Sequence, residues 1–278
     1  MRIGDGNEPA KEDDMVKMPA EIVIPWGGES SIKKLIQHTF PQLENHGWDA
    51  SYMVERAILT PKNCDVHMLN DMIINKFPGD EHILLSFDEV EGDTHNLYQQ
   101  EYLHTIAPGT LPPHILKIKI GNLLDVEILT DHNAGKRAFL PRIKLKTTDG
   151  AGLPFVLIRK QFPVKLCFGI TINKSQGQTI PNVGIYIPRH VFSHGQLYVA
   201  LSRGVSRAAT RVLIKDGKVE GEEGDFTKNI VFKEILLSQP QVCISKSRET
   251  ICSGFYFGTD LVNPQHSLIL EEFNLHGL

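Results

Sequence analysis

The amino-acid sequence predicts an α/β fold built on a parallel sheet, and two patterns support this prediction. First, a buried strand is expected at residues 56–60, followed by a turn at 61–63, an amphipathic helix and a second strand at 82–87. This order of strand, helix and strand is the building unit of parallel sheets. Second, the apolar stretch 164–172 runs directly into a polar turn that ends at Gly177. Because ligands bind at the carboxyl edge of such sheets, that turn is a candidate functional site.

The overall composition is that of an ordinary globular protein, with 41% hydrophobic and 22% charged residues among 278. The formal net charge of -4 gives no general attraction to nucleic acid, so binding of that kind would need a local basic patch. Scattered cysteines without a C-x-x-C pair, together with dispersed histidines, predict neither a metal site nor a disulfide framework. No apolar stretch is long enough to cross a bilayer, and the acidic N-terminal stretch is unlike a targeting signal.

The first part of the chain, residues 1–55, is expected to hold a lead-in and one helix. The lead-in, residues 1–28, contains turn residues, acids and only a short apolar island, which indicates an extended segment. Ser30 or Ser31 can cap the helix that follows, and its apolar positions keep helical spacing until Pro41 stops it.

Residues 56–115 are predicted to form the first part of the α/β domain. Acidic residues gather at 88–93, and paired carboxylates can serve acid–base catalysis or bind a metal. Here they lie beside a glycine, with no apolar surroundings that would shift their pKa values. A solvated loop is therefore the favoured interpretation.

Several short strands are expected in succession after this loop, and they predict a small β-barrel inserted at residues 116–162. The α/β domain then resumes over residues 163–237. It is expected to contain a core strand at 210–214 and to close with a helix at 228–237. The tail, residues 238–278, remains unassigned.

Residues 133–165 carry an excess of positive charge inside an otherwise acidic protein. Phe139 and Phe155 are interleaved with it, a pattern typical of surfaces that bind the phosphates and stack the bases of a single strand. The alternative is a solvated face of alternating strands whose lysines protect a sheet edge, and the residues alone leave both interpretations open. The candidate basic patch comprises Lys136, Arg137, Arg142, Lys144, Arg159 and Lys160.

Two short motifs resemble a known protein family. Residues 171–179, Thr-Ile-Asn-Lys-Ser-Gln-Gly-Gln-Thr, and residues 198–203, Tyr-Val-Ala-Leu-Ser-Arg, resemble the fifth and sixth helicase motifs of Pif-one-type DNA helicases, especially their Helitron-transposon branch. The similarity extends from residues 2–6 to residues 227–231. It implies a second RecA-like domain, of the P-loop NTPase type, with a small β-barrel insert. That insert is expected to be partly deleted, because family members carry a longer segment after Gly121.

The resemblance also implies roles for individual residues. Arg203 is expected to be the arginine finger that stabilises the phosphoryl group transferred from ATP, with Mg²⁺ as the accompanying ion. The turn is expected to contact the phosphates of single-stranded DNA and to couple the strand to the nucleotide. Its candidate residues are Thr171, Lys174, Ser175, Gln176 and Gly177. The family further implies a nuclear protein that acts in DNA repair, recombination and telomere maintenance.

Two elements of an ATP-hydrolysing site are absent from the sequence. The stretch Thr130–Arg137 resembles a phosphate loop but lacks its first glycine and the hydroxyl residue after the lysine. An apolar strand ending in Asp-Glu, which would hold Mg²⁺, is also absent. Both elements belong to the first RecA-like domain of a helicase. The chain is therefore expected to lack that domain and to need it as a separate or upstream partner.

Three hypotheses about function remain open. The chain can be the C-terminal half of an ATP-dependent 5′–3′ DNA helicase, inactive alone. It can be a non-enzymatic module that binds single-stranded DNA, or a decayed Helitron transposon product without function. A phosphate loop encoded upstream would favour the first, salt-dependent binding without nucleotide turnover the second, and an uncooperative melt the third.

Overall fold

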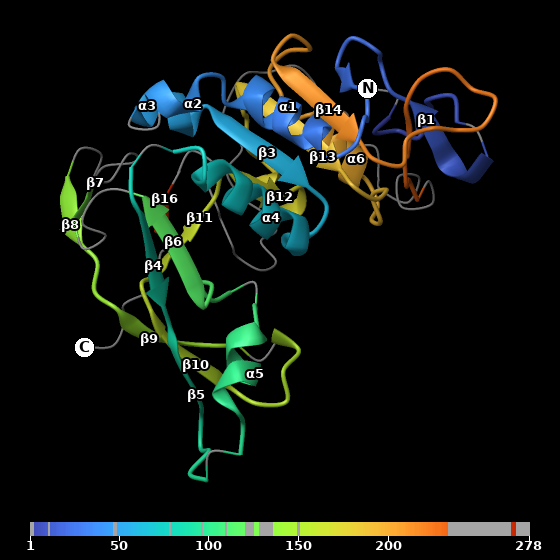
Figure 1. The fold of residues 1–278 in the computed structure, drawn as a ribbon. Helices are drawn as coiled ribbons and strands as arrows, with labels where there is room; N and C mark the ends of the chain where they lie inside the picture. Colours follow the sequence, from blue (N-terminus) through green and yellow to red (C-terminus); the bar gives the residue numbers. More distant parts are fainter. Residues whose placement is uncertain are drawn as a thin grey trace, which may run out of the picture.

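The computed structural model describes most of the chain up to residue 232 and one short strand near the C-terminus (Figure 1). These residues form a parallel sheet with helices on both faces and, beside it, a region of small antiparallel sheets. The described residues are 3–10, 12–46, 49–77, 79–95, 97–108, 110–119, 125–127, 136–148, 151–232 and 268–270.

The centre of the fold is a five-stranded parallel sheet with the strand order β12-β3-β13-β14-β2. The three inner strands consist almost wholly of buried residues, as expected of strands covered on both faces. The predicted parallel α/β sheet is therefore confirmed. Its strands are β2 (Val23–Ile24), β3 (Arg56–Thr60), β12 (Gly169–Thr171), β13 (Asn182–Ile187) and β14 (Thr210–Ile214).

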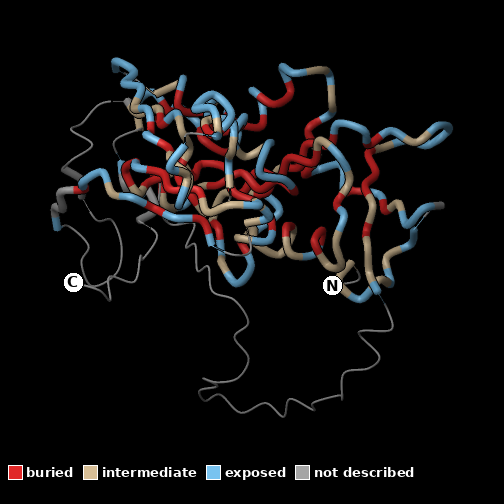
Figure 2. The backbone as a smooth tube through the Cα atoms, turned by 90° about the horizontal axis from the view of Figure 1, so that it is seen from below, coloured by how far each residue is buried: buried red, intermediate tan, exposed pale blue. Residues whose placement is uncertain are grey.

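Successive residues of the inner strands point into two different cores, because side chains alternate between the faces of a sheet. Ile58 packs with helices α1 (Ser30–Thr39) and α4 (Asn63–Ile74), whereas Leu59 packs on the other face with helix α6 (Gln196–Leu201). Figure 2 shows the buried segments running through the middle of the molecule. The sheet is thus the central one of three layers.

Helix α1 begins where it was expected, but neither serine is its N-cap. That position belongs to Glu29, and no side chain caps the helix. Ser31 is buried instead, and its hydroxyl accepts a hydrogen bond from the Gly27 N–H at 2.9 Å. The helix lies very close to β13 at Gly184, where an added Cβ would be 2.5 Å from the Thr39 hydroxyl oxygen. Only glycine allows this approach.

The strand expected at 82–87 exists, but it does not join the parallel sheet. β4 (Glu81–Leu85) pairs antiparallel with β6 (Ile115–Lys119) in a separate two-stranded sheet. The predicted strand–helix–strand unit is wrong at this point, because the neighbours of β3 are β12 and β13. In β4 every residue except the partly buried Leu84 is exposed, whereas the inner strands of the parallel sheet are almost wholly buried.

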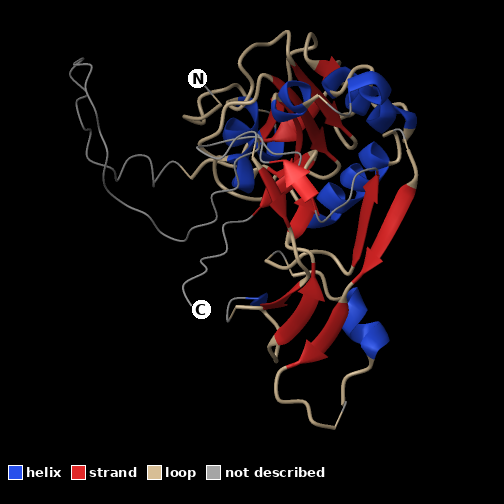
Figure 3. Ribbon diagram, turned by 90° about the vertical axis from the view of Figure 1, so that its left-hand side faces the viewer, coloured by secondary structure: helices blue, strands red, loops and turns tan. Residues whose placement is uncertain are grey.

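The small antiparallel sheets formed by β4, β6, β5, β10 and β9 extend away from the parallel sheet (Figure 3). The largest has the order β5-β10-β9, and helix α5 (Gln100–Thr105) packs beside β5. Among the described residues these strands form separate sheets, and the barrel stays a prediction. The additional strands are β5 (Phe87–Val90), β7 (Asp125–Glu127), β8 (Arg137–Phe139), β9 (Ile143–Lys146), β10 (Leu157–Gln161), β11 (Val164–Leu166) and β16 (Leu268–Leu270).

The N-terminal segment is packed rather than a loose lead-in. β1 (Met15–Lys17) pairs antiparallel with β15 (Phe226–Lys228), and β2 is an edge strand of the parallel sheet. The apolar side chains of Val16 and Met18 are almost fully buried in the core beneath α6. The helix predicted at 228–237 is wrong in its first part, since Lys228 ends a strand and residues 229–232 are not helical. Residues 233–237 lie outside the described part.

The remaining elements of the described residues are short. Among the helices described, none combines the length and the apolar character needed to cross a bilayer. These elements are η1 (Glu12–Asp14), α2 (Leu43–His46), α3 (Ala50–Val54) and η4 (Asn173–Ser175).

Candidate functional site

The turn predicted to contact DNA lies directly after β12, at the carboxyl edge of the parallel sheet. Thr171 ends β12 and is 9% exposed, and η4 follows at once. Ser175 is completely buried, and its hydroxyl donates to the carbonyl of Ile172 at 2.7 Å. Gln176 and Gly177 lie at the surface, where Gly177 has a φ of 84°. The turn therefore divides into a buried part that holds its shape and an exposed part that can meet a ligand.

Arg203 lies one residue beyond the C-cap of α6 and reaches across to this turn. One of its terminal nitrogens, Nη1, donates to the carbonyls of Ser175 at 3.2 Å and Gln178 at 2.8 Å. Its Nε donates to the carbonyl of Val199 at 3.0 Å, and Nη2 donates to the Ser202 hydroxyl at 3.0 Å. The two motifs singled out in the sequence are therefore joined by a single half-buried guanidinium.

A second contact joins the same two elements and was not predicted from the sequence. Gln196, which is 2% exposed, donates from Nε2 to Oδ1 of Asn173 at 3.1 Å and accepts from the Phe192 N–H at 3.1 Å. The backbone N–H of Ile180 also donates to the carbonyl of Arg203 at 2.9 Å. A glutamine at the start of an otherwise apolar helical run was the one sequence signal for this contact.

A cavity of about 340 Å³ adjoins the turn, between α4, the β11–β12 segment and the stretch that leads into β6. Thr171 and Lys174, both predicted to contact DNA, are among its lining residues. Lys117 and Lys165 also line it, together with His67, His104 and His114, and among the lining residues that the structure describes Asp71 is the one acidic residue.

Three lysines face one aspartate among these lining residues, so the cavity is electropositive, and the lysine charges act on one histidine. Burial lowers the pKa of His67, and the positive charges of Lys165 and Lys174 lower it further, while Asp71 acts in the opposite direction. His67 is therefore favoured in its neutral form. A cavity with this lining suits an anionic ligand with an apolar portion, such as a nucleotide unit of a nucleic acid.

The position of β12 beside the cavity is fixed by a buried amide. Asn70 on α4 is 5% exposed, and its Oδ1 accepts from the Gly169 N–H at 2.7 Å. Its Nδ2 donates to the carbonyl of Leu166 at 2.8 Å. Because both ends of the amide are satisfied by the backbone on either side of Phe168, α4 and β12 are held in register.

Arg159 does not belong to the predicted basic patch. Its side chain is fully buried, and it donates to both carboxylate oxygens of Asp88, from Nε at 2.8 Å and from Nη2 at 2.6 Å. Asp88, predicted to lie in a solvated loop, is fully buried as well. Arg159 also donates to the carbonyls of Leu103, Ile106 and Pro112, so it fixes the segment that walls the cavity.

The lysines of β9 are exposed, but acidic residues pair with them. Lys144 donates to Glu89 at 2.6 Å, and Lys146 is in contact with Glu91. These pairs favour the solvated-face interpretation for β9. Exposed ion pairs contribute about 0–1 kcal/mol, however, so a phosphate could replace the carboxylate at little cost.

The other members of the patch fall into different surroundings. Arg142 lies over the Phe162 ring at 5.0 Å, while Lys160 and Lys136 are exposed. The side chains of Arg137 and Phe139 lie outside the described part of the structure. Phe155 packs against Tyr98 with its ring centroid 4.5 Å away, so it is engaged in a core and not in a base-stacking surface.

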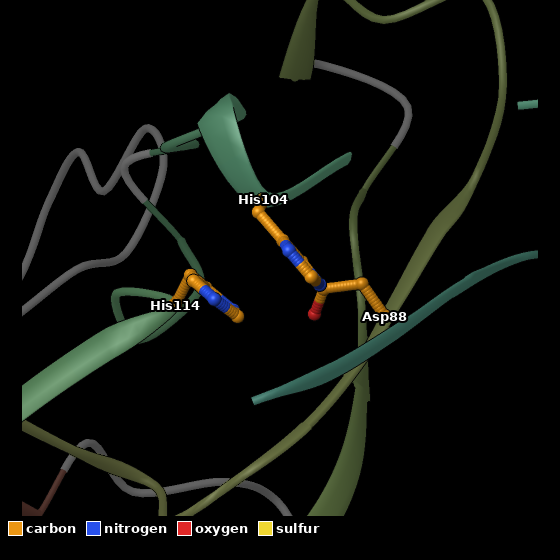
Figure 4. A group of neighbouring side chains, drawn as sticks. All are labelled: Asp88, His104 and His114. Carbon is orange, nitrogen blue, oxygen red and sulfur yellow. The ribbon is translucent and has the colours of Figure 1, made fainter. Parts of the chain in front are cut away.

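A histidine pair at the cavity wall forms a group with Asp88 (Figure 4). Ligand atoms of Asp88, His104 and His114 lie within 4.8 Å of one another, so they could in principle hold a metal ion. The ring centroids of His104 and His114 lie 3.7 Å apart, however, and the ring planes are only 11° from parallel. The nitrogen lone pairs of such stacked rings point in parallel planes and do not converge on one ion. Both oxygens of Asp88 are engaged by Arg159, and Ser86 donates to one of them.

The geometry of this group therefore favours a structural network over a metal site. Ser86 also contacts Nδ1 of His114 at 2.8 Å. Burial lowers the pKa of His114, and its stacked partner His104 lowers it further. A second histidine pair, His190 and His194, has the spacing of some metal motifs but lies in a loop, where the two rings have separate partners in Thr227 and the Phe232 N–H.

Comparison with known proteins places these motifs in context. No family model matches the chain. The sequence is 37% identical over 105 residues to ATP-dependent DNA helicase PIF1 of Saccharomyces cerevisiae (strain YJM789), covering 32% of this chain and 12% of the relative. It is 29% identical over 205 residues to ATP-dependent DNA helicase PIF1 of Danio rerio, covering 61% of this chain and 30% of the relative.

A solved structure is also among the matches. The crystal structure of Pif1 helicase from Bacteroides in complex with ADP-AlF3 and ssDNA matches with a TM-score of 0.42 and 16% identity, over 76% of this chain and 48% of that one. The chain spans less than a third of the length of the two curated relatives. Their sequences confirm the resemblance to Pif1-type DNA helicases that the motifs indicated.

Proposed function

We propose that this chain forms the C-terminal half of a Pif1-type, ATP-dependent DNA helicase, in which it holds single-stranded DNA and supplies an arginine to the ATP site. The observation that carries the proposal is the pair of hydrogen bonds from Arg203 to the carbonyls of Ser175 and Gln178. They join the two helicase-like motifs into one site. The sequence relatives are ATP-dependent DNA helicases, which supports the same class of activity.

The DNA-binding part of the proposal rests on exposure and charge. Gln176 and Gly177 are at the surface, and Lys174 lines the electropositive cavity next to them. An exposed amide side chain, a glycine with open space around it and a lysine can hold a phosphate backbone without reading bases. Ser175 is too buried to contact a strand directly, and its placement supports a role in shaping the turn.

The ATP part of the proposal assigns only one residue of this chain. A guanidinium has five N–H groups, and the contacts of Arg203 within the described residues use four of them. A phosphoryl oxygen could take the remaining N–H or displace a carbonyl. ATP and Mg²⁺ also require a phosphate loop and an acidic ligand, and the sequence contains neither motif. The chain alone is therefore expected to hydrolyse no ATP.

Several finer proposals rest on the family resemblance alone. They are unwinding in the 5′ to 3′ direction, partnership with a first RecA-like domain, and a nuclear location. Roles in repair, recombination and telomere maintenance, and descent from the Helitron branch, belong to the same group.

Binding of a labelled oligo-dT to the purified chain, followed by fluorescence anisotropy at several salt concentrations, tests the proposal. We expect affinity to fall with salt, and Lys174→Met to weaken binding several-fold and to reduce the salt slope by about one. Lys33→Met, an exposed lysine on α1, is the matched control and should bind as the wild type does. Absence of binding would overturn the proposal. So would an affinity that changes neither with salt concentration nor in Lys174→Met.

ATP hydrolysis measured in the same samples separates the enzymatic hypothesis from its alternative. Turnover by the chain alone would show that a nucleotide site exists without a phosphate loop. Turnover that appears only after a first RecA-like domain is added, and that Arg203→Ala abolishes, would support the helicase. DNA binding without turnover in either case would favour a non-enzymatic single-strand-binding module.

A further inference from the structure

Residues 83–90 form one extended segment whose outward-facing side chains are unusually apolar. Leu84, Ser86, Asp88 and Val90 point inward, whereas Ile83, Leu85 and Phe87 are exposed at 55%, 53% and 59%. Ile115 on β6 pairs with Leu85 and is 49% exposed. We call Ile83, Leu85, Phe87 and Ile115 the outer stripe. Scattered apolar residues are ordinary on a surface, but a contiguous row of this kind indicates a binding surface.

Basic residues flank the outer stripe at both ends. Lys117 pairs with Ile83 across β4 and β6, and Lys160 pairs with Phe87 across β5 and β10. Lys144 pairs in turn with Lys160 on the next strand. Paired residues of antiparallel strands share one face of the sheet, so Phe87, Lys160 and Lys144 form a row on the outer face. Within the described residues, the exposed side chain of Lys160 has no hydrogen-bond or ion-pair partner.

The outer stripe is continuous with the electropositive cavity. Ile115 and Lys117 line that cavity and also belong to, or pair with, the stripe. In Figure 1, β4 and β5 follow one another away from the parallel sheet, so the stripe leads from the cavity toward the small sheet. A ligand that enters at the cavity would meet Phe87 and Lys160 further along the same surface.

We propose that the outer stripe is a second contact surface for single-stranded DNA, with Phe87 as a platform for base stacking and Lys160 as a phosphate contact. The inference rests on the proposed function and extends it along the strand. An exposed aromatic beside cationic side chains is the arrangement that binds single strands without sequence preference. The lysine flanks favour an anionic partner over a neutral apolar one. Glu89 and Glu91 oppose them through exposed pairs with Lys144 and Lys146, which a phosphate can displace at little cost, and Glu81 lies exposed at the start of β4.

The test compares two oligo-dT lengths, of about 6 and about 16 nucleotides, in the range of single-strand site sizes. Phe87→Ala is expected to weaken binding of the longer oligonucleotide by roughly 5- to 150-fold, the loss that one base–aromatic stack implies. Binding of the shorter one, which fits at the turn and cavity, should change little. Tyr102→Ala is the control, since Tyr102 is an aromatic residue of similar exposure on α5, outside the stripe.

A second variant reports stacking directly. In Phe87→Trp, binding of the longer oligonucleotide should quench tryptophan emission more than it does in the wild type. Unchanged affinity of Phe87→Ala for the longer oligonucleotide, while the wild type binds both, would overturn the inference and leave the proposed function standing. Failure of the wild type to bind either length would remove the proposed function itself, and the inference with it. Loss of self-association in Phe87→Ala without loss of DNA affinity, measured by light scattering, would make the stripe a protein interface instead.

Discussion

Replacement of Arg159 by methionine tests the buried ion pair that organises the small antiparallel sheet. Methionine keeps most of the length of the side chain but removes the charge and every hydrogen bond of the guanidinium. Arg159 and Asp88 are both 0% exposed, and the arginine also satisfies three backbone carbonyls. Removing one partner of a buried pair leaves an uncompensated charge and costs about 3–5 kcal/mol. We therefore expect the free energy of unfolding to fall by about 4 kcal/mol, a large part of the usual 5–15 kcal/mol.

The assay must report on the small sheet and not only on the parallel one. Trp26 is partly buried and packs against the core beneath α1 and α4, so its emission follows the parallel sheet. Urea unfolding followed by far-UV circular dichroism gives the free energy, and hydrogen exchange over β5 and β10 locates the loss. The matched control is Lys160→Met, the next residue on the same strand, whose exposed side chain predicts a change within about 0.5 kcal/mol.

A double variant separates the buried charge from the other contacts. Asp88→Leu with Arg159→Met leaves no charge in the core, so it should be more stable than Arg159→Met alone. A loss below about 1 kcal/mol in Arg159→Met would refute the reasoning, because it would mean that water reaches Asp88 or that the pair is not formed. An equal loss of the free energy of unfolding in Arg159→Met and Lys160→Met would contradict the placement of Arg159 on the buried side of β10 and Lys160 on its exposed side.

Further predictions follow from close packing, a buried amide and buried histidines. Gly184→Ala should lower the free energy of unfolding by about 1–3 kcal/mol through overpacking against α1. Gly27→Ala, whose added Cβ would lie at an ordinary contact distance of 3.8 Å from the Ser31 hydroxyl oxygen, should change it little in urea unfolding. Asn70→Ala should cost about 1–3 kcal/mol and speed hydrogen exchange in β12, because buried backbone groups lose their partner; unchanged exchange there would contradict this. Because burial lowers the pKa of His67 and His114, folding favours their neutral forms. Stability should be complete above the ordinary pKa of about 6.5 and decline as the pH falls below it, as urea midpoints across that range would show.

The sequence patterns were most informative where burial on both faces left a continuous apolar run. The strands at 56–60 and 210–214 were predicted for this reason, and the turn after Thr171 was predicted because an apolar run gives way there to small and amide residues. Alternating segments were harder, since alternation does not reveal which face is inside. Arg159 and Lys160 are adjacent basic residues of one strand, yet one is fully buried and the other exposed. Only the position of Asp88 on the neighbouring strand decides between them.

The joining of the two motifs could not be predicted from their residues. Arg203 binds carbonyl oxygens of the turn, and every residue has a carbonyl, so no side-chain pattern marks its partners. The strand at 82–87 was assigned to the wrong sheet for a related reason. Its pairing with β6 is set by a partner about thirty residues further on, whereas local sequence carries information only about strand formation.

The small sheets formed by β4, β6, β5, β10 and β9 are inserted in the sequence between β3 and β12, two neighbouring strands of the parallel sheet, and this position determines how the fold tolerates changes in the length of the insert. β3 and β12 are neighbours, yet the pairing of Ile58 with Gly169 spans more than a hundred residues of sequence. The entropy of closing such a loop grows only with the logarithm of its length, so doubling the insert costs about 0.6 kcal/mol. Residues can therefore be lost from or added to the insert at almost no cost to the sheet that carries the turn and Arg203. Contact between β3 and β12 should instead be a late and slow event in folding, because so much chain must be brought together first.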